Sequence, residues 1–104
     1  MSLDIRLTVE NEANVVDKNI THNLTRMWKE AGVYEVLYKS DGKVSNEVLP
    51  TLKHGLKQLL TERERFKQDN RSNGARHYKI AILWLAVLVE ELIKYPDGTI
   101  RIDR

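Results

Sequence analysis

Both ends of the chain show the alternation of apolar and polar residues that predicts β-strands. Residues 3–9 place Leu, Ile, Leu and Val at every second position, and Thr99–Asp103 repeats the pattern with two isoleucines. The turn residues of 96–98, Pro-Asp-Gly, come directly before the second strand. Two strands make a marginal sheet, so we expect them to pair with each other and lie against helices. An open strand edge would be one route to oligomers.

Helical spacing of apolar residues fills the region between the two strands. A first helix is predicted from Asn19 or Thr21 as N-cap to about Ala31, where Gly32 ends it, and another turn or two follows over 33–37. The next helix begins between 45 and 50, and its apolar positions form one stripe: Leu49, Leu52, Leu56, Leu59 and Leu60. Thr61 and Glu64 have the spacing of a capping box, which predicts a short separate helix there.

The last predicted helix, from about Ala75 to Tyr95, contains ten consecutive apolar residues at Ile80–Val89. A surface helix needs an apolar stripe of only about 100°, whereas this run is apolar in every direction. A second copy of the same helix is the simplest cover, and twofold dimers are the commonest oligomers. We therefore expect a homo-oligomer, either a dimer or a tetramer, in which Leu85 and Val89 are needed for assembly and binding. The alternative is a wholly central helix in a compact monomer.

These elements predict a single α+β domain over residues 1–104. The N- and C-terminal strands form a small sheet, with three to four helices between them, the last long and apolar. The composition, 41% hydrophobic and 31% charged, is that of a folded domain. Cysteine is absent, the N-terminal residues lack the pattern of a signal peptide, and a ten-residue apolar run is too short to span a bilayer. We expect a cytoplasmic protein that makes no membrane contact.

Charge is distributed unevenly along the chain. The net charge is +2, from 17 basic and 15 acidic side chains, which is too small to favour duplex nucleic acid as a partner. Residues 53–79 carry eight basic and three acidic side chains, a local charge of +5. Such a segment favours a small anion or a short acidic partner, unless it is a solvated helix face.

Motifs for catalysis or cofactor binding do not emerge. The three histidines lack metal-ligand spacing, and neither a nucleophile elbow nor a glycine-rich phosphate loop is present. The adjacent Glu90 and Glu91 point in different directions on a helix, so they cannot form a close acid–base pair within one chain. We expect no cofactor and no enzymatic activity, although residues brought together across subunits leave an enzyme possible.

Two segments are unusually polar for the start of a helix. Amide, guanidinium and ring groups gather in each, and helix starts favour anions, arginine matches phosphate oxygens, and tyrosine or histidine can stack on a base. The alternatives are plain capping and an Asn-Gly turn. The predicted ligand-binding residues are Asn19, His22, Asn23 and Arg26 in the first segment, and Asn70, Arg71, Asn73, Arg76 and Tyr78 in the second.

The strings NITHNLTRMWKEAGVYEVLY, ERFKQDNRSNG and YPDGTIRIDR resemble a widespread family of small phage and prophage proteins. The resemblance covers nearly the whole chain after residue 17. Where that family has Trp-Gly after its Asn-Gly loop, this chain has Ala75 and Arg76, which puts any role of that Trp in doubt here. The family in turn resembles the viral sponge proteins that sequester cyclic nucleotide signals of bacterial CBASS immunity.

The resemblance implies an immune-evasion protein that binds a cyclic nucleotide, such as a cyclic dinucleotide, without cleaving it. A phage-encoded protein of this kind would act in the host cell cytoplasm. Two alternatives stay open: a protein-binding inhibitor that docks on a host enzyme through the basic face of residues 53–67, and a hydrolase of the same signals.

Overall fold

The computed structural model describes residues 2–9, 14–21, 24–64 and 74–103, and for residues 2, 14, 15, 21 and 74–76 it describes the backbone alone. Its elements follow one another as β1 (Ser2–Thr8), β2 (Asn14–Thr21), α1 (Thr25–Ala31), α2 (Tyr34–Lys39), α3 (Ser45–Thr61), α5 (Gly74–Lys94) and β3 (Thr99–Asp103). The N- and C-terminal strands share a sheet and the helices lie between them in the chain, so the predicted α+β class is confirmed.

The sheet has three antiparallel strands in the order β2-β1-β3 within the described part of the chain. The terminal strands pair as predicted, with Leu7 of β1 opposite Ile100 of β3. On the other side of β1, Leu3 lies opposite Ile20 and Leu7 opposite Val16. The strand from the start of the chain is therefore the central one, with a neighbour on each side.

Strand β2 corrects the prediction that Asn19 or Thr21 caps a helix. Both residues lie at the end of β2, and α1 begins after them at Thr25. Val16 and Ile20 are buried, but the position between them on the same face is the half-buried Lys18. This lysine interrupts the apolar alternation. The polar residues that follow β2 in the sequence have the composition of a helix N-terminus, which is why the pattern predicted a helix there. No side chain caps α1, because its N-cap residue is Leu24.

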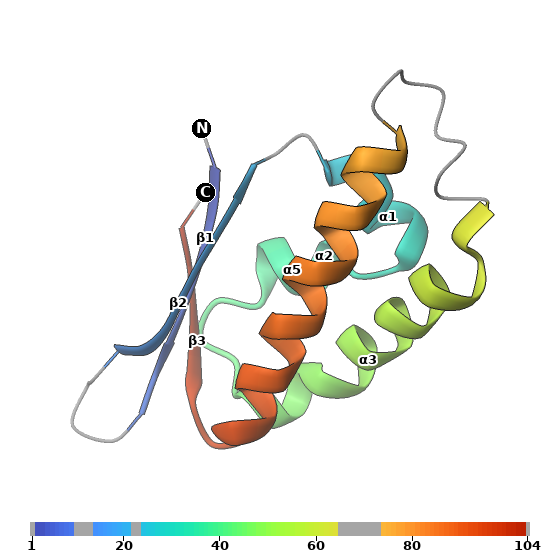
Figure 1. Ribbon diagram of the computed structural model, residues 1–104. Helices are drawn as coiled ribbons and strands as arrows, with labels where there is room; N and C mark the ends of the chain where they lie inside the picture. The colour runs from blue at the N-terminus through green and yellow to red at the C-terminus, as the bar shows by residue number, and fades with distance from the viewer. Residues whose placement is uncertain (1, 10–13, 22–23, 65–73, 104) are drawn as a thin grey trace.

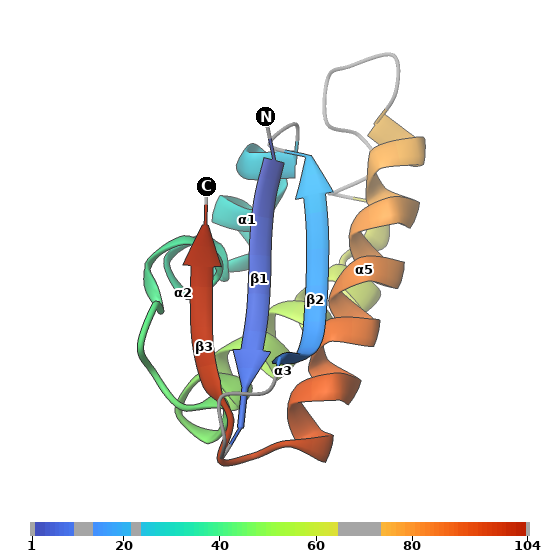
Figure 2. The same cartoon turned by 90° about the vertical axis from the view of Figure 1, so that its left-hand side faces the viewer.

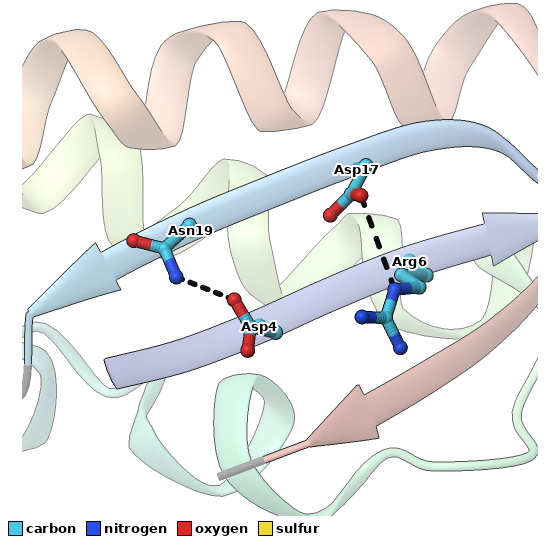
Figure 3. A network of polar contacts seen from close by, with 4 residues as sticks. All are labelled: Asp4, Arg6, Asp17 and Asn19. Atoms are coloured by element: carbon cyan, nitrogen blue, oxygen red, sulfur yellow. Dashed lines mark hydrogen bonds and ion pairs between the residues drawn. The ribbon is translucent and has the colours of Figure 1, made fainter. Parts of the chain in front are cut away.

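All the described helices cover one face of the sheet, and the other face is open (Figure 1). The inner face is apolar, whereas the outer face, seen from the front in Figure 2, carries polar residues from all three strands. On it Asn19 donates to the Asp4 carboxylate, and Arg6 lies 3.9 Å from Asp17 (Figure 3). Such exposed pairs contribute little to stability. They make a solvated face that does not require a covering layer.

The free edges of the sheet are engaged by other parts of the chain. Along β3, Ile100 exchanges backbone hydrogen bonds with Gly42 and Lys43, at 2.7 and 2.8 Å, and the Asp41 carboxylate accepts from the Ile102 N–H at 2.8 Å. At β2, the Trp84 indole N–H donates to the Asn19 carbonyl at 3.1 Å. Groups that are already bonded cannot template a further strand, so pairing between subunits through β3 is disfavoured, whereas at β2 the bond engages the Asn19 carbonyl alone.

Helices α1 to α3 follow the sequence pattern closely. Gly32 ends α1 in the left-handed conformation, with φ of 81°. Helix α3 begins at Ser45, where the Glu47 carboxylate accepts from the Val44 N–H at 3.3 Å. Gly55 lies so close to Val33 that α3 packs tightly on the turn between α1 and α2.

The C-terminal end of α3 differs from the prediction at two residues. Thr61 belongs to the last turn of α3 and donates to the Lys57 carbonyl at 2.9 Å, so it is not the cap of the separate helical residues 63–64 that follow Glu62. Leu60 leaves the leucine stripe: it is 52% exposed, while Leu49, Leu52 and Leu59 are buried.

Helix α5 has one buried face and one exposed apolar stripe. Leu85 and Val89, which we expected at a subunit interface, lie in the core of the single chain with exposed fractions of 0% and 6%. On the opposite side, Ile80, Leu83 and Val87 are 39%, 59% and 38% exposed, and we call these three residues the α5 stripe. The sequence could not decide which direction of an all-apolar run faces inward. None of the helices in the described residues has the length and apolarity needed to cross a membrane.

Candidate functional site

The described residues of the first polar segment do not converge on one point. Asn19 is exposed on the outer face of the sheet, where its amide is bonded to Asp4. Arg26 lies on α1 on the other side of β2 and is ion-paired with Glu30 at 3.8 Å, one turn further along the helix. His22 and Asn23 lie outside the described residues. Asn19 and Arg26 are therefore each paired with a different acidic residue.

Tyr78 is the one predicted residue of the second segment whose side chain is described. It is buried, and its hydroxyl donates to the Leu59 carbonyl at 2.5 Å. The ring joins α5 to the end of α3, which is a structural role and not the base-stacking role that we expected. Asn70, Arg71 and Asn73 lie outside the described residues, as does the side chain of Arg76.

Burial raises the pKa of Tyr78 above its ordinary value of 10.0, Arg63 opposes this rise, and Glu64 adds to it. The folded protein thus keeps the phenol neutral at a pH where the unfolded chain ionises it. The stabilisation from Tyr78 is complete below pH 10 and is lost as the pH rises through the raised pKa.

We expect urea midpoints to fall more steeply above pH 10 for the wild type than for Tyr78→Phe, measured by circular dichroism from pH 7 upward. Equal alkaline slopes in Tyr78→Phe and the wild type would contradict a raised pKa of Tyr78 in the folded protein.

Trp84 connects α5 to both the sheet and α1. Its indole donates to Asn19 on β2, and its ring lies 5.8 Å from the ring of Trp28 on α1, centroid to centroid. Trp28 is completely buried, and within the described residues its own indole nitrogen has no hydrogen-bond partner. The two tryptophans thereby hold α1, β2 and α5 in a fixed arrangement.

His77 belongs to the second polar segment and lies near the start of α5. It precedes Trp84 by seven residues, about two turns, so both side chains leave the same face of α5. Strand β2 runs towards the start of α5 (Figure 2), and seven residues of helix place His77 about 10 Å nearer that end than Trp84. It is half-buried. The predicted residues omitted His77 in favour of Tyr78; its spacing from Trp84 was the available signal.

The first turns of α1 and α5 lie at the same end of the molecule, where β2 also ends (Figures 1 and 2). Parts of two segments that are far apart in the sequence thus lie at one end of the fold. Arg26 is exposed on α1, and His77 is half-buried on α5. We call this end of the molecule the candidate site. Its described polar side chains include Arg26 and His77.

A surface hollow lies at the junction of α1 and α2, apart from the candidate site. It has a volume of about 450 Å³ and is lined by Lys29, Gly32, Tyr34, Glu35 and Lys39. The Tyr34 ring already has two partners, because the Lys29 ammonium lies over it at 4.8 Å and the Tyr38 ring stacks on it at 4.6 Å.

Metal chemistry has no support in the described residues. No three His, Asp or Glu side chains among them come together as a metal ion would require.

A scan with family models, a search of curated proteins and a search of solved structures each found no match to this chain. The functional inference therefore depends on the residues themselves and on the resemblance of the sequence motifs.

Proposed function

We propose that this protein is a non-catalytic, homo-oligomeric binding protein that sequesters a phosphate-bearing nucleotide signal, with a cyclic dinucleotide as the expected ligand. The observation that supports it is that α1 and α5, whose first turns carry the described parts of the two polar segments, begin at the same end of the molecule (Figure 1). A guanidinium on α1 and an imidazole on α5 suit a phosphate and a base respectively. The motif resemblance adds the biological setting: a phage protein that evades bacterial antiviral defence in the host cytoplasm.

Calorimetry with a panel of cyclic dinucleotides and related ADP-ribose signals tests the proposal. We expect one ligand to bind, and we expect Arg26→Ala and Arg71→Ala each to weaken it about tenfold or more, because a hydrogen bond to a charged group contributes about 1.5–3 kcal/mol. Arg101→Ala is the matched control: Arg101 is exposed on the outer face of the sheet, away from α1 and α5, so its loss should leave affinity unchanged.

Absence of binding across the panel would overturn the proposal, as would unchanged affinity in both arginine variants. The bound ligand should also be recovered chemically intact after heat release. A cleaved product would replace sequestration by hydrolysis.

One observation favours a protein-binding inhibitor as a second candidate. Lys53 and Lys57 are both exposed on α3, four residues apart, and therefore form a basic row that an acidic surface could contact. A Lys53→Glu/Lys57→Glu double variant should then lose any host protein that the wild type captures from lysate. Equal capture by both proteins would exclude this face.

A further inference from the structure

The α5 stripe is a row of exposed apolar side chains, and the same helix also exposes Lys79, Glu90 and Ile93. Ile80, Leu83 and Val87 recur at intervals of three and four residues, so they lie in one row along α5. Residues 41–43 bond the β3 edge, and the outer face of the sheet is polar. Of the described surfaces, the stripe is the one that presents a row of apolar side chains for burial.

The charged residues beside the α5 stripe indicate which partner fits it. Lys79 and Glu90 are both exposed and are eleven residues apart, about three turns, so they lie on the same flank of the stripe. When two identical helices pack antiparallel about a twofold axis, a flank meets the same flank of its partner. Lys79 would then approach the partner's Glu90, and Glu90 the partner's Lys79.

The spacing of these residues fits one centre of symmetry. A twofold axis near Leu83 places Ile80 opposite the partner's Val87, because these residues lie three before and four after it. The same axis leaves Lys79 and the partner's Glu90 about 3 Å apart along the helix direction, an offset that a lysine side chain spans. A parallel pair in register would instead bring each of these residues to the level of its own copy, which removes the complementarity.

We propose that a second copy of this chain docks on the α5 stripe, with the two α5 helices antiparallel and Lys79 paired with the partner's Glu90. This specifies the assembly in the proposed function, but it does not depend on the ligand. Three apolar side chains and their flanks make a small interface, so association in the micromolar range is expected.

Sedimentation velocity on the full-length, ligand-free protein, from about 5 to 500 µM, tests the interface. We expect the wild type to move from monomer to dimer over this range and Leu83→Asp to stay monomeric throughout. Leu60→Asp is the matched control, since Leu60 is similarly exposed but lies on α3. A wild type that is monomeric at the highest concentration would overturn the proposal, and so would equal loss of dimer in both variants.

Charge reversal tests the antiparallel arrangement separately. Lys79→Glu and Glu90→Lys should each weaken dimerisation about five- to thirtyfold, because each replaces two exposed attractive pairs by repulsive ones. The double variant restores the pairs in reversed order and should recover the wild-type dissociation constant. A double variant as weak as the single ones would overturn the antiparallel pairing. Because no ligand is present, these results stand apart from the binding test above.

Discussion

Replacing Leu85 by Asp is expected to leave the chain unfolded at 25 °C. Leu85 is completely buried, and an unpaired carboxylate in an apolar core costs several kcal/mol, comparable with the whole stability of a small domain. Leu83→Asp, two residues earlier on α5, is the matched variant: Leu83 is 59% exposed, so the fold should keep its stability to within about 0.5 kcal/mol. Far-ultraviolet circular dichroism and urea unfolding distinguish the two.

The comparison also tests which face of α5 points inward. Two α-helical residues that are two positions apart differ by about 200° in direction, so they cannot share an environment. If both variants fold with equal stability, or if Leu83→Asp is the one that unfolds, the described orientation of α5 is wrong.

Trp28→Ala is expected to lose about 3–5 kcal/mol of stability, the usual range for a large buried aromatic side chain. Trp28 is completely buried and contacts Trp84, which in turn is bonded to β2, so its removal also loosens α5 from the sheet. The stability is obtained from urea denaturation followed by circular dichroism.

Trp28→Phe is the control for this substitution. It keeps an aromatic ring and removes the indole N–H that has no partner among the described atoms, so the desolvation cost of that group disappears with it. We expect its loss of stability to be well below that of Trp28→Ala. A Trp28→Ala protein within about 1 kcal/mol of the wild type would contradict the central position of this side chain.

The sequence predicted those elements whose periodicity is uninterrupted. The alternation in 3–9 and 99–103 identified β1 and β3, and Gly32 correctly marked the end of α1. Strand β2 was missed because Lys18 occupies an inward position and shortens the apolar pattern. The apolar alternation reflects the residues of one segment alone. Strand β2 has a mixed sequence and is a strand because it pairs with β1.

The candidate site was less accessible to sequence reasoning. Adjacent helical residues point about 100° apart, so Tyr78 and His77 have different environments: Tyr78 is buried against α3, whereas His77 is half-buried. Which of them enters the core depends on where α3 and β2 lie. The same dependence made Leu85 and Val89 appear to be interface residues, when the exposed ones are Leu83 and Val87.

The central position of β1 has a consequence for how quickly the chain folds. Thr8 and Thr99 are paired although 91 positions separate them, whereas the β1–β2 hairpin and the contacts of successive helices are local. Contacts between distant residues slow folding, because the intervening chain must first be ordered. During synthesis β3 is the last described element to emerge, so one edge of β1 stays unpaired until then. Before β3 arrives, the nascent chain carries an open strand edge beside apolar surface, which is where aggregation begins.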